Sequence, residues 1–274
     1  MIGGARNSGY TDSRNRPMKL YQVDAFTSSL FAGNPAAVVP LDSWPDDALL
    51  QNIALENNLS ETAFLAPDDT GYALRWFTPT VEVDLCGHAT LAAAWVVFNA
   101  LGFPGERVRF NTASGALYVN RSGQTLTLDF PTRPGKPVND TAAYETALGL
   151  PVREVLQARD TLVIVDSADL VRDFQPDFTA ISRLDTFGVI LSAPGDDCDF
   201  VSRFFAPAKG VPEDPVTGSA HCTLVPYWAD RLNKATLFAR QLSPRGGELH
   251  CRLDGERVSL SGQARCYLKG DILL

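Results

Sequence analysis

The sequence lacks the cysteine spacings that mark disulfide-stapled or metal-bound folds. Its five cysteines are an odd number, and none of them forms a Cys-x-x-Cys motif. This argues against a disulfide framework and against a zinc knuckle. The adjacent pairs His221-Cys222 and His250-Cys251 match no common zinc spacing either. We therefore expect a protein of the reducing cytoplasm that holds no metal.

A surplus of positive charge and long apolar runs are also missing. The chain has 24 Lys and Arg against 32 Asp and Glu, a formal net charge of −8, whereas phosphate contacts need clustered Lys and Arg. No stretch approaches the ~20 consecutive apolar residues of a membrane span, and residues 1–17 lack the apolar core of a secretory signal. We expect neither nucleic acid nor a membrane as partner. Residues 1–17 are expected to be a disordered extension before Met18.

The composition is that of a globular protein, with 45% hydrophobic and 20% charged residues, and 274 residues leave room for two domains. Residues 45–58 combine near-helical spacing of apolar residues with acids in the first turn, which predicts a helix. Runs of β-branched and aromatic residues bounded by turns predict strands. These runs are 19–27, 35–41, 61–67, 72–79, 107–120 and 124–131.

The segment "DLCGHATLAAAW" (84–95) opens an unusual helix. From Ala89 to Phe98, apart from Thr90, there is no polar side chain to face water. A helix that is apolar all round must be buried on every side, and about ten residues are too few for a membrane span. Because predicted strands flank this helix, we expect a curled sheet to enclose it.

The second half of the chain repeats the first. "LRWFTPTVEVDLCGHATLAAAW" (74–95) aligns with "SRFFAPAKGVPEDPVTGSAHCTLVPYW" (202–228), and the matches come in the same order. The aligned pairs are Arg75 with Arg203, Phe77 with Phe205, Pro79 with Pro207, Asp84 with Asp214, and Gly87-His88-Ala89 with Gly218-Ser219-Ala220. The repeat predicts a duplicated domain, each copy with one buried helix.

The predicted fold is α+β: two pseudo-symmetric domains, each a curled mixed or antiparallel sheet around a buried central helix. Prolines at 131, 134 and 137 mark the boundary, which gives domains of 18–130 and 131–274, with the last strand free to return to the first domain. Two helix N-termini facing each other would line a cleft with free N–H groups. Such a cleft suits a carboxylate, even in an acidic protein.

Several residues at these helix starts could do chemistry, and each also has a structural interpretation. Cys86 corresponds to Thr217 in the second copy; because threonine cannot take a carbon-bound proton, a two-thiol epimerase is disfavoured, and Cys86 is equally a small buried residue. His88 is expected to stay neutral at a helix N-terminus and to hydrogen-bond either a substrate or the helix cap. Asp214 precedes a proline and can point into the cleft or make a turn. Ser219 is a substrate ligand or an N-cap.

Two further kinds of residue lie near these helix starts. Arg75 and Arg203 are expected to be structural partners of carboxylates rather than substrate clamps. Glu61, in "NNLSETAF", stands just before an apolar strand and has no acidic counterpart in the second copy. Burial would raise its pKa toward the range useful for acid–base work, and one acid in a symmetric cleft favours single-base chemistry. A solvated Glu61 is the other interpretation.

Four segments together resemble the phenazine-biosynthesis PhzF-like family: "VDAFTSSLFAGNPAAVV", "NLSETAFL", "RWFTPTVEVDLCGHATLAAAW" and "DPVTGSAHC". The match runs from about Met18 to the C-terminus. The family is similar in fold to diaminopimelate epimerase, with the site between two similar domains. The resemblance implies a homodimeric isomerase without cofactor or metal, acting on a small carboxylic acid.

In the family's phenazine enzyme, a glutamate moves a proton within trans-2,3-dihydro-3-hydroxyanthranilate. Carried over by motif, the catalytic residues are Glu61, His88, Asp214 and Ser219, and Gly87 and Gly218 lend backbone amides to the substrate carboxylate beside Cys86 and Thr217. Two alternatives stay open. One is a racemase or epimerase with Cys86 and Glu61 on opposite faces of the substrate, and the other is a non-catalytic binding or interaction module.

Overall fold

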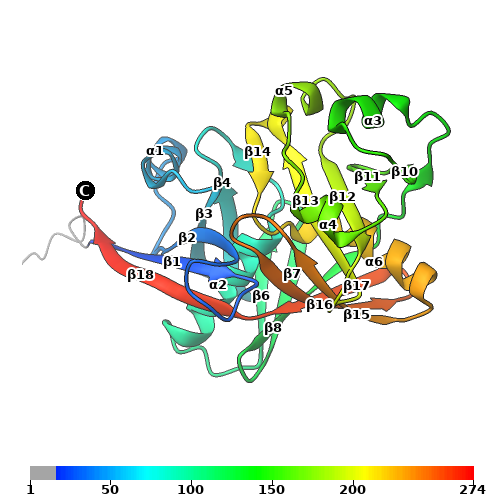
Figure 1. Cartoon of the computed structure of the whole chain (residues 1–274). Coiled ribbons are helices and arrows are strands. Elements are labelled where there is room, and N and C mark those ends of the chain that lie inside the picture. Colours follow the sequence, from blue (N-terminus) through cyan, green and yellow to red (C-terminus); the bar gives the residue numbers. More distant parts are fainter. Residues whose placement is uncertain (1–16) are drawn as a thin grey trace, which may run out of the picture.

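The computed structural model describes residues 17–274, so the expectation for residues 1–16 lies outside the described part of the chain. The architecture is α+β, with a mixed sheet that continues through both halves of the chain (Figure 1). Within residues 17–274, no helix is long and apolar enough to cross a membrane.

From residue 17 on, the first half contains eight strands and two helices. The strands are β1 (Met18–Ala25), β2 (Asn34–Pro40), β3 (Glu61–Asp68), β4 (Gly71–Phe77), β5 (Glu82–Val83), β6 (Arg107–Thr112), β7 (Gly115–Ser122) and β8 (Thr125–Pro131). The helices are α1 (Asp47–Asn57) and α2 (Gly87–Asn99). The prediction of one strand over 107–120 is wrong: the chain turns between Thr112 and Gly115, where Gly115 has a φ of +98°, and forms two strands.

The second half has more helices. Its strands are β9 (Lys136–Pro137), β10 (Glu154–Gln157), β11 (Thr161–Ile164), β12 (Val189–Pro194), β13 (Phe200–Ala206), β14 (Val211–Asp214), β15 (Thr236–Gln241), β16 (Gly247–Asp254), β17 (Arg257–Gly262) and β18 (Ala264–Ile272). Its helices are α3 (Ala142–Leu148), α4 (Ala168–Arg172), α5 (Phe178–Ile181), the 3₁₀ turn η2 (Pro207–Lys209) and α6 (Gly218–Leu232).

The strand pairings repeat between the halves, as the sequence repeat predicts. β2 pairs in parallel with β3, and β4 with β6; likewise β11 pairs in parallel with β12, and β13 with β15. An antiparallel pairing of β8 with β17 joins the two halves. The last strand, β18, returns to the first half of the chain and runs antiparallel along β1 (Figure 1). The division into domains at residue 130 remains a prediction.

The two central helices lie inside this sheet. All residues of α2 from His88 to Phe98 are buried except the half-buried Trp95, so the prediction of a helix buried on every side is confirmed. Helix α6 packs against β15, β16 and β17 in the second half and also contacts α2. Apolar side chains of α2 and α6 belong to one core cluster that spans both halves. This shared core brings the two helix N-termini together.

The aligned arginines occupy equivalent places. Arg75 on β4 makes a bidentate pair with Glu82 of β5, with N–O distances of 2.7 and 2.8 Å. Arg203 on β13 makes the same pair with Glu213 of β14, at 2.7 and 2.9 Å. The structure therefore places both arginines as partners of carboxylates, as predicted. They differ in burial, since the Arg203 side chain is 7% exposed and that of Arg75 is 26% exposed.

Candidate active site

Glu61 and His88 meet where β3 begins and α2 starts. Oε2 of Glu61 lies 3.0 Å from Nε2 of His88, and the two side chains are 17% and 6% exposed. The turn through Gly87 starts α2 and turns His88 toward the first residue of β3. The structure thus brings together the carboxylate and the imidazole that the sequence selected, in a largely buried setting.

Cys86 lies beside the pair formed by Glu61 and His88. Its Sγ is 3.6 Å from Nδ1 of His88, and ligand atoms of Glu61, Cys86 and His88 all lie within 4.8 Å of one another. Burial, together with the negative charge of Glu61, raises the pKa of the Cys86 thiol to about 11, so the thiol is protonated at neutral pH. Carboxylate, thiol and imidazole together are a donor set that a zinc-type ion accepts. The absence of a metal remains a prediction from the sequence.

The ionisation of Glu61 and His88 differs from the sequence-based expectation. Burial favours the neutral form of both groups, but each is charged next to the other. The charge of His88 and hydrogen bonds from His88, Ser60 and Cys86 outweigh burial and lower the pKa of Glu61. Interactions with Cys86 and Glu61 likewise outweigh burial and raise the pKa of His88 well above its usual value. The expected raised pKa of Glu61 and neutral His88 are therefore wrong, because the sequence did not show that they pair.

Asp214 approaches the pair from the second half of the chain. Its Oδ1 accepts a hydrogen bond from Nδ2 of Asn34 at 2.8 Å, and its Oδ2 accepts one from the Thr217 hydroxyl at 2.5 Å. The same Asn34 nitrogen lies 3.1 Å from Nδ1 of His88. Burial raises the pKa of Asp214 to about 6, against the opposing charge of His88 and these hydrogen bonds. Asn34 therefore links the acid of one half to the imidazole of the other.

The N-termini of the two central helices abut, as predicted. A Cβ atom built on Gly87 would lie 3.7 Å from Cα of Gly218. Among the described residues, neither N-cap residue, Cys86 or Thr217, caps its helix with a side-chain hydrogen bond. The Thr217 amide donates to Gln241 at 2.8 Å and is occupied, but the first-turn amides that follow Gly87 and Gly218 receive no side-chain cap. Uncapped N–H groups at helix starts are the kind of donor that binds anions in proteins.

Ser219 is the second residue of α6 and is half-buried. It is not the N-cap, which is Thr217, so the capping interpretation of Ser219 is wrong. Its position next to Gly218 places it at the junction of the two helices.

Asn34 is the residue that sequence reasoning missed. It is fully buried, although it stands in "FAGNP", a segment whose Gly-Asn-Pro content indicates a turn. A buried asparagine needs partners, and its partners here come from three different segments. The only sequence signal was its presence in a family-like motif.

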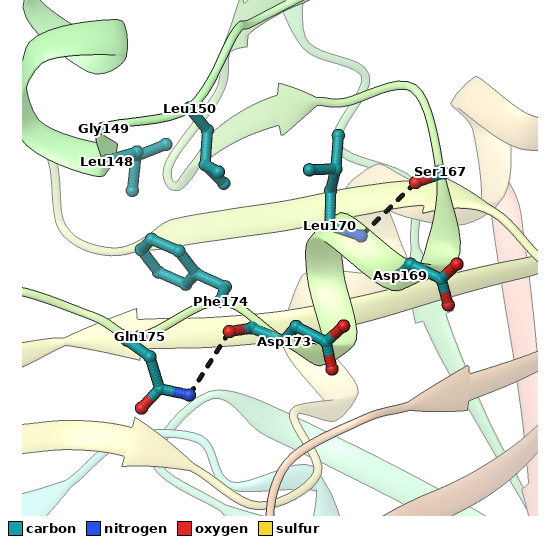
Figure 2. Close-up of a pocket in the computed structure, with 9 residues that line it drawn as sticks. All are labelled: Leu148, Gly149, Leu150, Ser167, Asp169, Leu170, Asp173, Phe174 and Gln175. Carbon is teal, nitrogen blue, oxygen red and sulfur yellow. Dashed lines mark hydrogen bonds between the residues drawn. The ribbon is translucent and has the colours of Figure 1, made fainter.

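A surface pocket lies away from these residues. It has a volume of about 340 Å³ and lies beside α3 and α4, lined by leucines, Phe174 and the acids Asp169 and Asp173 (Figure 2). Ser167 accepts a hydrogen bond from the Leu170 amide at its rim. None of the nine lining residues is a predicted site residue.

The environment of Asp214 leads to a stability prediction. A carboxyl group whose pKa rises from 3.8 unfolded to about 6 folded binds more protons in the native state between these values. Its contribution to stability is therefore full below pH 4 and is lost as the pH rises to about 6. Replacing Asp214 by Asn removes this term. We expect the difference in unfolding free energy between Asp214→Asn and the unaltered protein to shift by about 2 kcal/mol in favour of the variant from pH 4.5 to pH 7.5.

Urea unfolding at the two pH values measures this shift. The matched control is Asp84→Asn, because Asp84 is the aligned residue of the first half and is exposed. A shift of the same size in both variants would show that burial of Asp214 is not its cause.

Comparisons with known proteins agree with this architecture. The sequence model of the PhzC-PhzF family, described as phenazine biosynthesis-like protein, matches residues 23–270. An uncharacterized isomerase from Pseudomonas aeruginosa is 56% identical over 258 residues, which cover 94% of this chain and 99% of the relative.

Solved structures give the same result. A PhzF-family phenazine biosynthesis protein from Enterococcus faecalis superposes with a TM-score of 0.93 at 46% identity, covering 94% of this chain and 100% of that one. A hydroxyproline epimerase from Agrobacterium vitis superposes with a TM-score of 0.62 at 12% identity, covering 94% and 93%. The second likeness concerns the fold alone.

Proposed function

This chain belongs to the PhzC-PhzF family of phenazine biosynthesis-like proteins, and from that premise we propose that it is an isomerase that moves a proton within a small carboxylic acid. The membership confirms the resemblance seen in the sequence. The observation that carries the proposal is the 3.0 Å contact between Glu61 and His88 at the junction of two uncapped helix starts.

In the proposed reaction, Glu61 is the base. Its pKa is lowered, so it is a carboxylate at neutral pH and ready to accept a proton. It takes a proton from a carbon of the substrate while the C–H electron pair moves into an adjacent π bond. Glu61 then returns that proton to another carbon of the same π system, on the same face. Protons and electrons balance without a cofactor.

The neighbouring groups would hold and polarise the substrate. The amides at the starts of α2 and α6, beside Gly87 and Gly218, would bind its carboxylate. His88, Asp214 and Ser219 would hydrogen-bond its amine, hydroxyl or carbonyl group as charge moves. Oε2 of Glu61 is shielded from solvent, and the Glu61 side chain as a whole is 17% exposed.

The racemase alternative needs Cys86 and Glu61 on opposite faces of a carbon. Each acid or base must then lie ~3–3.5 Å from that carbon, which separates the two atoms by about 6–7 Å. Here the thiol and carboxylate atoms lie within 4.8 Å of each other. This geometry supports one base acting on one face. Homodimer assembly, which the resemblance implied, and a cytoplasmic location, which the cysteine usage indicated, stay predictions.

Proton exchange in heavy water tests the proposal. The protein, treated beforehand with a chelator, would be incubated with a panel of small amino and hydroxy acids that includes trans-2,3-dihydro-3-hydroxyanthranilate. Proton NMR should show loss of one carbon-bound proton signal with the matching acid. The absence of both exchange and a rearranged product with every acid of the panel would count against this substrate class, and activity only without chelator would count against cofactor-free chemistry.

A methyl group at the helix junction tests the carboxylate site separately. A Cβ at Gly218 would meet Gly87 Cα at 3.7 Å and Leu260 Cδ1 at 3.9 Å, both ordinary contacts. Gly218→Ala should therefore unfold within about 1 kcal/mol of the unaltered protein, yet its methyl group occupies the proposed anion site. We expect its affinity for anthranilate, measured by calorimetry, to fall tenfold or more. Gly270→Ala, in β18, is the control, and equal affinity in both variants would place the carboxylate elsewhere.

A further inference from the structure

The side-chain amide nitrogen of Asn34 has more polar neighbours within hydrogen-bonding distance than it has protons to donate. Its Nδ2 lies 2.8 Å from Oδ1 of Asp214, 2.9 Å from the Val216 carbonyl oxygen and 3.1 Å from Nδ1 of His88. The hydroxyl of Ser60 lies 3.4 Å from its Oδ1. A primary amide has two protons on nitrogen and no acceptor there. Three neighbours therefore compete for two protons.

The Val216 carbonyl fixes which way the amide points. Oxygen and nitrogen of an asparagine are assigned from their hydrogen-bond partners. A carbonyl can only accept, so the Asn34 atom 2.9 Å from it must be the nitrogen. With the amide turned the other way, an oxygen would face both this carbonyl and Asp214. The donor side of Asn34 consequently faces His88.

We infer that Asn34 is a positioning residue that decides which nitrogen of His88 gives up its proton: when the ring becomes neutral, Nδ1 is left bare and the single remaining proton stays on Nε2, facing Glu61. A proton on Nδ1 would point at an amide nitrogen that cannot accept it. The protonated thiol of Cys86, 3.6 Å from Nδ1, is a second donor on that side. On the other side of the ring, Nε2 faces the carboxylate of Glu61 at 3.0 Å.

The groups around the ring have opposite effects on the pKa of His88. Glu61, Cys86 and Asp214 are the titratable groups at the site, and interactions with Glu61 and Cys86 raise the pKa of His88. Asn34 opposes this rise in pKa, because its amide donor faces Nδ1 and disfavours a proton on that nitrogen. As the pH rises, the ring should therefore lose its proton from Nδ1, and at a lower pH than it would without the Asn34 amide.

The fold holds Asn34 in place from the second half of the chain. The preceding residue, Gly33, has a φ of +69°, and a Cβ there would lie 2.2 Å from the Ala25 carbonyl oxygen. The Gly33 amide donates to the Gly246 carbonyl at 2.7 Å. Arg245 donates to the Gly33 carbonyl and to Asp24, each at 2.8 Å. The turn before Asn34 is thus tied to the turn between β15 and β16.

The chain contains only three histidines, which makes nitrogen NMR of the ¹⁵N-labelled full chain a direct test. His221 serves as an internal reference of the opposite kind, because its Nδ1 lies 2.8 Å from the Thr217 carbonyl and must carry a proton. His250 is exposed. We expect the neutral ring of His88, assigned with His88→Gln, to show a protonated Nε2 and a bare Nδ1. A proton on Nδ1 of the neutral ring would overturn the inference.

Variants of Asn34 test the cause. Asn34→Ala removes the donor, and Asn34→Asp keeps the shape but offers an acceptor. Nδ1 should keep its proton to a higher pH in both, by about one pH unit in Asn34→Ala, as expected for one hydrogen bond, and by more in Asn34→Asp. Asn120→Asp, at an exposed position of β7, adds the same charge elsewhere. Titration of Nδ1 that is unchanged in both Asn34 variants, or equally changed in Asn120→Asp, would also overturn the inference. Since no substrate is needed, this outcome is independent of the proposed reaction.

Discussion

Glu61→Gln should lose proton exchange between substrate and heavy water by at least 10²–10⁴-fold, the usual contribution of a general base. The amide keeps the size of the side chain and an oxygen that can still accept from Nε2 of His88, which lies 3.0 Å away. The substitution therefore removes the base and leaves the shape of the site. Affinity for the same acid, measured by calorimetry, should stay within about threefold.

The control for this variant is Glu56→Gln, which changes an exposed acid of α1. It should exchange protons at the rate of the unaltered protein. If Glu61→Gln kept its exchange rate, Glu61 would have no part in the reaction, and His88 or Asp214 would be the next base to test. If it lost affinity and exchange together, Glu61 would be a binding residue.

Arg203→Met should cost about 3–5 kcal/mol of unfolding free energy, the usual effect of breaking a buried ion pair. The side chains of Arg203 and Glu213 are 7% and 13% exposed, so the variant leaves a carboxylate buried without its partner. It also removes the donors to the carbonyls of Val171, at 3.3 Å, and Phe174, at 2.6 Å. These contacts fix α4 and the chain after it against β13.

The repeat supplies the matched control. Arg75→Met removes the equivalent bidentate pair, but Glu82 is 40% exposed and Arg75 is 26% exposed. Water can solvate the remaining carboxylate, so we expect a cost of about 1 kcal/mol. Urea unfolding compares the two variants, and the double variant Arg203→Met with Glu213→Leu should recover most of the loss. Equal costs for Arg75→Met and Arg203→Met would show that burial does not decide the strength of these pairs.

The fold could be predicted from the sequence because the second half of the chain repeats the first. A single apolar helix after "CGH" indicates only a buried segment, whereas the same arrangement at "TGS" predicts a duplicated domain. The strand pairings repeat accordingly. The turn between β6 and β7 was missed although "NTASGA" contains the Ser114-Gly115 dipeptide, which is a turn signal; the turn uses the positive φ of Gly115.

The site was predicted less completely, because its chemistry depends on contacts between distant segments. Local sequence could select Glu61, His88 and Asp214 as candidates, but it could not show that Glu61 pairs with His88. That pairing reverses the expected pKa shifts of both. Asn34 is 180 residues from Asp214 and 54 from His88 in sequence, so its role becomes visible only when the two halves are folded together.

The central claim is that one base moves one proton within one molecule. Following a deuterium label from substrate to product tests this claim most directly. The acid identified by exchange would be prepared with deuterium at the exchanging carbon and converted in ordinary water under single-turnover conditions. We predict that the product keeps deuterium at its new position above the solvent background, with no inverted stereocentre. A product that has lost all its deuterium and is inverted at that carbon would contradict the claim and require a second acid or base on the opposite face.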